Sequence, residues 1–271
     1  RRSSPLLALA APAALGLGHA SARGEAVAAP VDACAQVEDE LAGMWDRDRR
    51  RAVAQALIDT GRGYAADVAA QVVDRLDAQA DAWVELRGEL CEQERSAGDD
   101  VAAREQLHLV MACLDRGRGE LQALADALLA DPDGLLDNAV AAAFRQQSVE
   151  LCRRRPDLAL RSPGTLSPAR AASLSRLGAR LDVLDALLKA GDHERGQARA
   201  RGVLADARGL ADDHAIAEAL YLLGAFTAGR GHHEEAERWL FDAALMAERA
   251  GDLVTLARAR TELVVVVGYR L

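Results

Sequence analysis

Four cysteines are the residues best able to do chemistry in this 271-residue chain, and they stand at positions 34, 91, 113 and 152. No two of them have the C-x-x-C spacing that is typical of structural zinc sites. An even number of cysteines suits two disulfides if the chain folds in an oxidising compartment. The alternative is four buried free thiols, and the sequence leaves both open at this point.

A pair of histidines beside a pair of glutamates also suggests a metal site. The run reads His232-His233-Glu234-Glu235. It lacks the H-E-x-x-H arrangement, which places two histidines one helical turn apart on one face. Adjacent side chains point in different directions, and the surrounding residues suit a turn. We therefore interpret these residues as part of a loop and expect no metal or other cofactor in this chain.

The glycine-rich stretches do not form a phosphate-binding motif. Gly61-x-Gly63 and Gly117-x-Gly119 are too short, and neither is followed by G-K-[ST]. No H-R-D or D-F-G sequence is present, so the parts that a protein kinase needs for phosphoryl transfer are missing from this chain. Serine, histidine and aspartate are scattered without a nucleophile elbow. We expect the chain as given to have no catalytic residues.

Composition predicts that the elements that position these residues are all helices. Half of the residues are hydrophobic but only 3% are aromatic, and the chain is rich in the strong helix formers Ala and Leu. The net charge of −9 disfavours a nucleic-acid partner, because phosphate binding needs clustered positive charge. The basic clusters at Arg47, Arg49–Arg51 and Arg153–Arg155 are short and mixed with acidic residues or ended by Pro156, as expected of solvated helix faces.

The first 22 residues are predicted to be the remnant of a membrane anchor or a signal segment. Arg1-Arg2 precede an apolar run from Pro5 to Ala20, and Ala20-Ser21-Ala22 suits a signal-peptide cleavage site. Both interpretations place the rest of the chain outside the cytoplasm. A disordered Ala/Pro linker is the third alternative. Residues 23–30 follow as a flexible linker.

Apolar residues at helical spacing predict a bundle or stalk over residues 31–155 that contains all four cysteines. The spacing predicts four helices. The first starts at Val31 and ends at Gly61-Arg62-Gly63, and the second runs from Tyr64 to a stop at Ser96-Ala97-Gly98. The third is capped by Asp99 or Asp100 and continues through Leu128, and the fourth runs from Leu135 to Cys152. Turn signals separate them, such as Asp131-Pro132-Asp133-Gly134. The proline-rich residues 156–166 are predicted to be a loop at a domain boundary.

Hairpin register selects one of the three possible cysteine pairings. Cys34 and Cys91 stand at about 27 and 30 residues from the turn at Gly61, which is an offset of only about 5 Å along straight helices. Cys113 and Cys152 are both about 20 residues from the turn at Pro132-Asp133. Pairing Cys91 with Cys113 would leave an offset of about 15 Å, well beyond the reach of about 7 Å between Cα atoms. The prediction is therefore Cys34–Cys91 and Cys113–Cys152.

Residues 167–271 contain an internal repeat. Gly191-Asp192-His193-Glu194 returns as Gly231-His232-His233-Glu234, and Ala211-Asp212 returns as Gly251-Asp252. The period is about 40 residues, which is the length of a two-helix repeat.

The best copy of the repeat resembles the tetratricopeptide family, in the residues Leu220-x-x-Leu223-Gly224 followed by Ala236, Leu240 and Ala243. This resemblance implies an α-solenoid in which Gly224 faces Ala236 within one hairpin and the concave surface binds a protein or peptide. It covers two repeats and half of a third, with the array truncated at its C-terminus. The chain departs from the family pattern in having Glu248 at the terminal proline and Thr227 at the first helix's aromatic position.

The region before the repeats also resembles a known arrangement. It contains Cys34 and Trp45, then Trp83-x-x-x-Arg87-x-x-x-Cys91, then Cys113-Leu114-x-Arg116 and Cys152. This order is similar to the segment between the membrane helix and the tetratricopeptide repeats in a group of large bacterial, eukaryotic-like serine/threonine protein kinases. The resemblance implies that a cytoplasmic, ATP-dependent kinase domain precedes the membrane segment, and that this region is extracytoplasmic.

These observations lead to one expected function and one alternative. The first is a non-catalytic sensor or interaction region of a membrane-anchored serine/threonine kinase, which binds protein or peptide partners through its repeats. The alternative is a secreted or periplasmic repeat protein that acts as an adaptor without a kinase.

Overall fold

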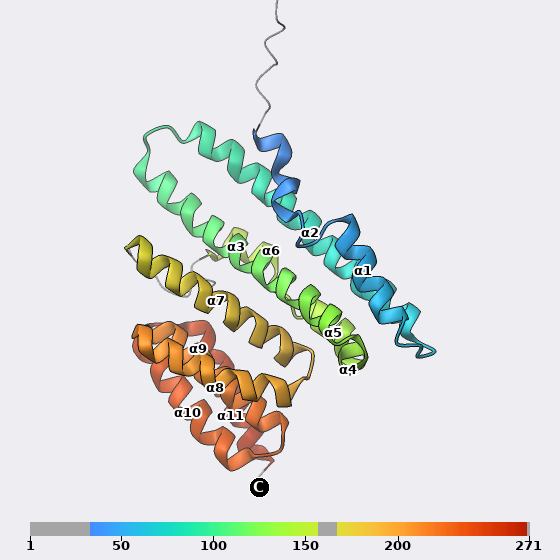
Figure 1. Cartoon of the computed structure of the whole chain (residues 1–271). Coiled ribbons are helices and arrows are strands. Elements are labelled where there is room, and N and C mark those ends of the chain that lie inside the picture. The colour runs from blue at the N-terminus through green and yellow to red at the C-terminus, as the bar shows by residue number, and fades with distance from the viewer. Residues whose placement is uncertain (1–32, 157–166, 270–271) are drawn as a thin grey trace, which may run out of the picture. The chain divides into compact units, whose positions relative to one another are not determined.

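The computed structural model describes residues 33–156 and 167–269, which form helices and no strand (Figure 1). The predicted all-α class is therefore confirmed for this part of the chain. The predicted anchor or signal segment 1–22, the linker 23–30 and nearly all of the loop 156–166 lie outside it. Among the helices that the structure describes, none is both long enough and apolar enough to cross a membrane.

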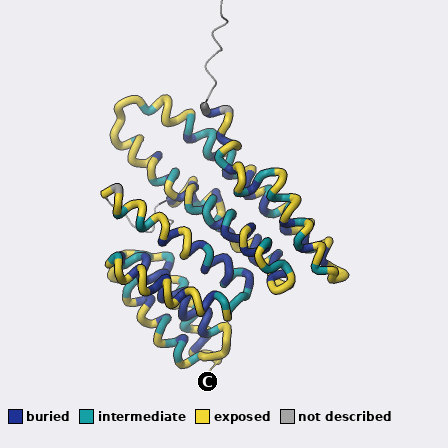
Figure 2. Tube along the Cα trace, viewed as in Figure 1, coloured by how far each residue is buried: buried dark blue, intermediate teal, exposed yellow. Residues whose placement is uncertain are grey.

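The elements, in chain order, are η1 (Ala33–Leu41), α1 (Arg47–Ile58), α2 (Ala65–Ser96), α3 (Val101–Ala130), α4 (Pro132–Leu135), η2 (Leu136–Asn138), α5 (Ala139–Phe144), α6 (Val149–Arg154), α7 (Pro168–Lys189), α8 (His193–Leu210), α9 (Asp213–Gly229), α10 (His233–Ala250) and α11 (Leu253–Gly268). Apolar side chains line the inner faces of these helices, as the buried stretches in Figure 2 show.

The first predicted helix is wrong as a continuous element. The chain forms the 3₁₀ segment η1, turns at Gly43, which has a φ of +74°, and begins again as α1. The Asp46 carboxylate accepts hydrogen bonds from the backbone N–H groups of Asp48 and Arg49 and so caps α1. The apolar spacing continues through the turn because η1 and α1 both bury their apolar residues against α2, so periodicity alone does not show the break.

The fourth predicted helix, Leu135–Cys152, is also wrong, because this stretch is divided into η2, α5 and α6, with α4 before it. Helix α5 ends at Phe144, and the next four residues leave the helical path before α6 begins. Within this gap, the backbone N–H of Gln147 donates to Glu120 and its side-chain amide donates to the carbonyl of Cys113. Contacts with α3 replace the helical hydrogen bonds, and a local pattern cannot reveal such long-range partners.

The predicted boundary at 156–166 does not separate two independent cores. Helix α7 packs against α3, and Ala186 of α7 and its C-cap residue Ala190 belong to the same apolar cluster as the four-cysteine region. A second apolar cluster is built from α7 to α11. Helix α7 thus contributes to both clusters, and the residues from Ala33 onward form one compact unit.

Four similar turns connect the helices from α7 to α11. A residue with positive φ stands at Gly191, Ala211, Gly231 and Gly251, so the turns recur every 20 residues. After each of them, the next N–H donates to a carbonyl five residues back, at 2.8–3.5 Å, which is the hydrogen bond of a Schellman cap. In three of the turns an aspartate then caps the following helix. The 40-residue sequence repeat is therefore built from two copies of one turn.

Ala211 is the one non-glycine residue with positive φ among the residues described, at φ +48°. Its Cβ makes this left-handed conformation unfavourable, whereas glycine adopts it without strain. We expect Ala211→Gly to raise the free energy of unfolding by about 0.5–1 kcal/mol, measured by urea denaturation. The matched control is Ala198→Gly in the exposed interior of α8, which should lower it by about 1 kcal/mol. Changes of the same sign in both variants would contradict this account.

The close approach expected between α9 and α10 is present, but its partner residue differs. A Cβ added at Gly224 would lie 2.7 Å from Cγ of Leu240 and 3.2 Å from its backbone nitrogen. Gly224 therefore faces Leu240, one turn beyond the predicted Ala236. All the other predicted repeat-packing residues are buried, namely Leu220, Leu223, Ala236, Leu240 and Ala243.

A charged cavity between the helices

The cysteines form the two predicted pairs. Cys34 is joined to Cys91 and Cys113 to Cys152, with Cα atoms 5.6 and 5.4 Å apart. The first bridge fastens η1 to α2, and the second fastens α6 to α3. All four cysteines of the chain are paired, as is typical of a protein that folds in an oxidising, extracytoplasmic environment.

The two histidines of the predicted loop stand at the start of α10. His232 occupies its N-cap position, and the ring of His233 stacks on that of Tyr269, with centroids 5.3 Å apart. Within residues 33–156 and 167–269, no three His, Cys, Asp or Glu side chains are grouped as metal ligands.

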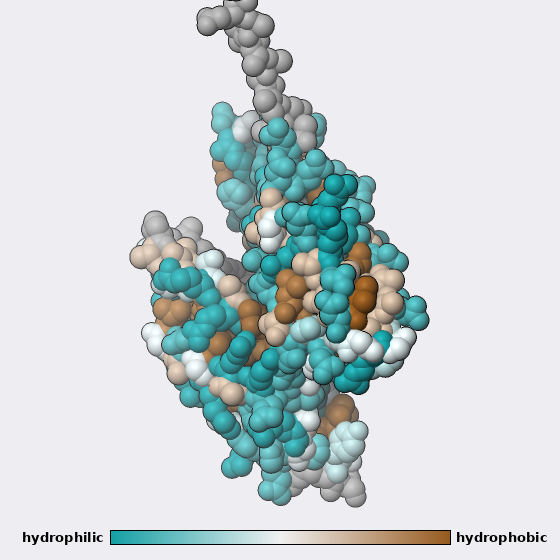
Figure 3. Space-filling view, turned by 45° about the vertical axis from the view of Figure 1, so that its right-hand side comes forward, coloured by the Kyte–Doolittle hydropathy of each residue, from teal (hydrophilic) through white to brown (hydrophobic). Residues whose placement is uncertain are grey.

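The arginine clusters are interspersed with carboxylates instead of forming a basic patch. Arg49, Arg50 and Arg51 pair with Asp126, Asp77 and Asp48. In the second cluster, Arg153 and Arg154 pair with Glu89 and Glu150. Figure 3 likewise shows a mainly hydrophilic face, on which the hydrophobic residues gather in small separate groups.

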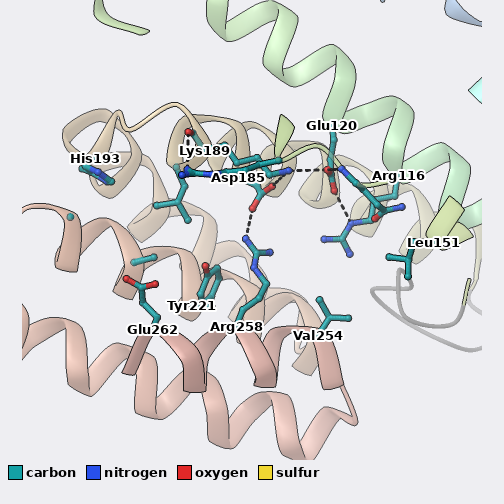
Figure 4. Close-up of a pocket in the computed structure, with 15 residues that line it drawn as sticks. Arg116, Glu120, Leu151, Asp185, Lys189, His193, Tyr221, Val254, Arg258 and Glu262 are labelled. Carbon is teal, nitrogen blue, oxygen red and sulfur yellow. Dashed lines mark hydrogen bonds and ion pairs between the residues drawn. The ribbon is translucent and has the colours of Figure 1, made fainter. Parts of the chain in front are cut away.

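A cavity of about 600 Å³ lies where α3 and α6 meet α7, α9 and α11 (Figure 4). Helices α7 and α9 are the first helices of the hairpins α7–α8 and α9–α10, and α11 follows them at the same spacing, so one side of the cavity has a repeating wall. Helices α3 and α6 of the four-cysteine region form the other side. The lining residues used below are Arg116, Glu120, Gln147, Leu151, Asp185, Lys189, Tyr221, Val254, Arg258 and Glu262.

Buried ion pairs connect the walls of this cavity. Lys189 lies 3.0 Å from Glu120 of α3 and 2.7 Å from Asp185 of α7. Asp185 also pairs with Arg258 of α11, at 2.5 Å. Four helix segments that are far apart in sequence are joined in this way, because Arg116 of α3 additionally pairs with Glu218 of α9 at 3.1 Å.

The charged state of this network is strongly favoured. Burial alone would raise the pKa of the Asp185 carboxyl, but the charges of Arg258 and Lys189 outweigh it and lower the pKa below its ordinary value of 3.8. Burial likewise opposes the charge on Lys189, and Asp185 and Glu120 outweigh it and raise the pKa of the ammonium group. The pairs are therefore ionised at neutral pH.

Aromatic and apolar groups complete the cavity. The guanidinium of Arg258 lies over the ring of Tyr221, with its central carbon 4.3 Å from the ring centroid, which is a cation–π contact. Burial raises the pKa of the Tyr221 hydroxyl, so this group stays neutral. Leu151 of α6 and Val254 of α11 supply apolar surface, and both are half-buried.

Gln147 connects the second disulfide to the charged network. Its amide nitrogen lies 3.2 Å from the sulfur of Cys113 and 3.3 Å from that of Cys152. Its backbone N–H donates to the same Glu120 oxygen that accepts from Lys189. The Cys113–Cys152 bridge therefore positions one wall of the cavity.

Sequence reasoning did not find this site. The pairs Arg116–Glu120 and Asp185–Lys189 have the i, i+4 spacing that is typical of exposed helix faces, so their types and spacing carry no signal of burial. Acids and bases on separate helices become neighbours only in the folded chain. The comparisons add no assignment, since no family model, no curated protein and no solved structure matches this chain.

Proposed function

We propose that this chain is a non-catalytic interaction region that binds a protein segment in the cavity between α3, α6 and the helices α7, α9 and α11. The observation that carries the proposal is the cavity itself, whose lining combines apolar, aromatic and paired ionic groups from five helices. Such a lining can bind a peptide and distinguish its side chains by their polarity and charge. The cations Arg116, Lys189 and Arg258 are held in fixed pairs with Glu218, Glu120 and Asp185.

The proposed architecture of the binding part is a tetratricopeptide-type α-solenoid. The 20-residue spacing of the turns, the tight contact at Gly224 and the placement of α7, α9 and α11 along one wall support it. In a solenoid of this kind, the curvature of the stacked repeats creates an extended concave surface that can bind a partner.

The proposed context is the extracytoplasmic part of a membrane-anchored serine/threonine protein kinase. The support is the resemblance in the order of Cys34, Trp83, Cys91, Cys113 and Cys152 ahead of the repeats, together with the disulfides. A secreted or periplasmic adaptor without a kinase fits the disulfides equally well. The residues encoded upstream of Arg1 distinguish the two.

Filling the cavity tests the binding proposal. Val254 lies at the start of α11 and is half-buried, so Val254→Trp should obstruct the cavity with little loss of stability. In a pull-down from the envelope fraction of the native cell, we expect at least a tenfold smaller yield of the captured partner than with the unaltered chain. The matched control is Leu253→Trp, because Leu253 is 63% exposed and does not line the cavity. Equal yields from both variants would exclude the cavity as the binding site.

A further inference from the structure

We infer that the segment bound in this cavity carries a basic side chain, and that its charged group binds the carboxylate of Glu262. This inference rests on the proposed function and specifies the chemistry of the partner. It is drawn from the charge balance of the lining, from the position of Glu262 on α11 and from the apolar surface on the same face of that helix.

Glu262 is the unpaired carboxylate of the cavity. Among the described residues, three carboxylates line it, and two of them are engaged, because Glu120 and Asp185 both pair with Lys189. Glu262 makes no hydrogen bond or ion pair with any residue that the structure describes. Its side chain is half-buried, so it has lost part of its contact with water, and a counter-ion there is attracted more strongly than at an open surface.

The side chains around Glu262 do not neutralise it. Figure 4 shows Glu262 and His193 at one end of the cavity, with Tyr221 beside them. Burial lowers the pKa of His193 and outweighs the opposite effects of Asp192 and Glu262, so the ring is neutral at neutral pH. Burial raises the pKa of Tyr221, so this hydroxyl carries no charge either. A positive charge at this end has to come from a ligand.

The cations of the lining have other partners. Three of them pair with buried carboxylates, namely Arg116 with Glu218, Lys189 with Glu120 and Arg258 with Asp185. The fourth, Arg145, is exposed and donates to the backbone carbonyl of Lys189. The charges within each pair largely cancel, and the net charge of −9 of the whole chain attracts cations in general.

The position of Glu262 on α11 also sets the spacing of the ligand. Val254, Arg258 and Glu262 follow one another at intervals of four residues and all line the cavity. At a rise of about 1.5 Å per residue, Val254 and Glu262 stand about 12 Å apart along the helix axis. Leu151 lies at the Val254 end of the cavity (Figure 4).

An extended segment covers this distance in about 3–4 residues. We therefore expect the basic residue three or four positions away from an apolar residue that packs on Leu151 and Val254.

The test is retention of the full 271-residue chain on three bead-bound peptide libraries. The libraries share random apolar flanking residues and differ only in a fixed central residue, which is Lys, its neutral analogue acetyl-lysine, or Glu. We expect at least tenfold more protein on the Lys library than on the acetyl-lysine library, and a loss of this preference when NaCl is raised from about 50 to 500 mM. Equal retention on Lys and acetyl-lysine, preference for Glu, or no retention on any library would overturn the inference.

Variants connect the preference to Glu262. Glu262→Gln removes the charge and keeps the shape of the side chain, so it should reduce retention on the Lys library to the acetyl-lysine level, with folding verified by circular dichroism. Glu262→Lys should reverse the preference towards the Glu library.

The matched control separates this site from the general attraction of an acidic chain. Glu105→Gln removes the same charge at an exposed position of α3 that does not line the cavity, and should leave the preference for Lys intact. A preference for Lys that survives in folded Glu262→Gln, or that Glu105→Gln abolishes equally, would contradict the site.

The two proposals fail separately. If the envelope partner is captured by the unaltered chain and lost with Val254→Trp, while the Lys and acetyl-lysine libraries bind equally, the binding function stands and the basic ligand is wrong. If the Lys library is preferred through Glu262 but no partner depends on the cavity, the ligand chemistry stands and the protein-binding function is wrong.

Discussion

Asp185→Ala should lower the free energy of unfolding by about 3–5 kcal/mol, because it leaves two buried cations without their shared carboxylate. Asp185 is 4% exposed in its side chain and lies 2.5 Å from Arg258 and 2.7 Å from Lys189. Urea denaturation followed by circular dichroism measures the effect. The matched control is Asp206→Ala, which removes a surface pair with Arg180 and should cost less than about 1 kcal/mol.

The same substitution should change the response to acid. Because Arg258 and Lys189 lower the pKa of Asp185 despite its burial, ionised Asp185 stabilises the folded state fully above its unfolded pKa of about 4. This contribution is lost as the pH falls below that value towards the lower pKa of the folded state. The unaltered chain should therefore lose more stability between about pH 5 and pH 2 than Asp185→Ala does. Parallel curves for the two proteins would show that Asp185 is not held in its charged form.

Removing the second disulfide should have a comparable effect. Cys113 and Cys152 close a loop with a sequence separation of 39 residues, and the chain-entropy relation gives about 4 kcal/mol for a loop of that length. We expect Cys113→Ala combined with Cys152→Ala to lower the free energy of unfolding by roughly 2–5 kcal/mol in urea denaturation. The paired substitution avoids leaving a single reactive thiol in the core.

A second measurement separates the bridge from the lost side-chain volume. Adding a reductant should destabilise the unaltered chain through both bridges, but the double variant only through Cys34–Cys91. The difference between the two effects measures the contribution of the Cys113–Cys152 bridge. Mass spectrometry of non-reduced digests should find only the pairs Cys34–Cys91 and Cys113–Cys152. A peptide joining Cys91 to Cys113 would contradict the fold of the first three helices.

The parts of the fold that depend on local pattern were predictable from the sequence. The turns near Gly191 and Gly231 and the helices that follow them depend on residues close to one another in the chain. The pairing of Cys113 with Cys152 was also predicted correctly, although its register argument assumed a continuous fourth helix, which the structure breaks after Phe144. The same reasoning failed at η1 and at the gap after Phe144, where contacts with α2 and α3 decide the backbone path. It also divided the chain at 156–166, because a proline-rich loop carries no information about α7 packing on α3.

The cavity could not be predicted, for a physical reason. Arg116, Lys189 and Arg258 occupy helix positions that look solvated in isolation, and each becomes buried only because an acid from another helix accepts its charge. Helix faces are assigned from the spacing of apolar residues. A charged residue is therefore placed on the surface, even where an ion pair lets it be buried.

Tension applied between the two ends of this chain would act differently on its two halves. The disulfides close loops with sequence separations of 57 and 39 residues, and these loops cannot lengthen while the S–S bonds remain intact. No cysteine follows Cys152, so the hairpins from α7 onward are held by noncovalent contacts alone. Stretching would therefore extend the hairpins first, helix by helix. The covalently closed half would resist extension, and the cavity that it shares with the hairpins would open early under load.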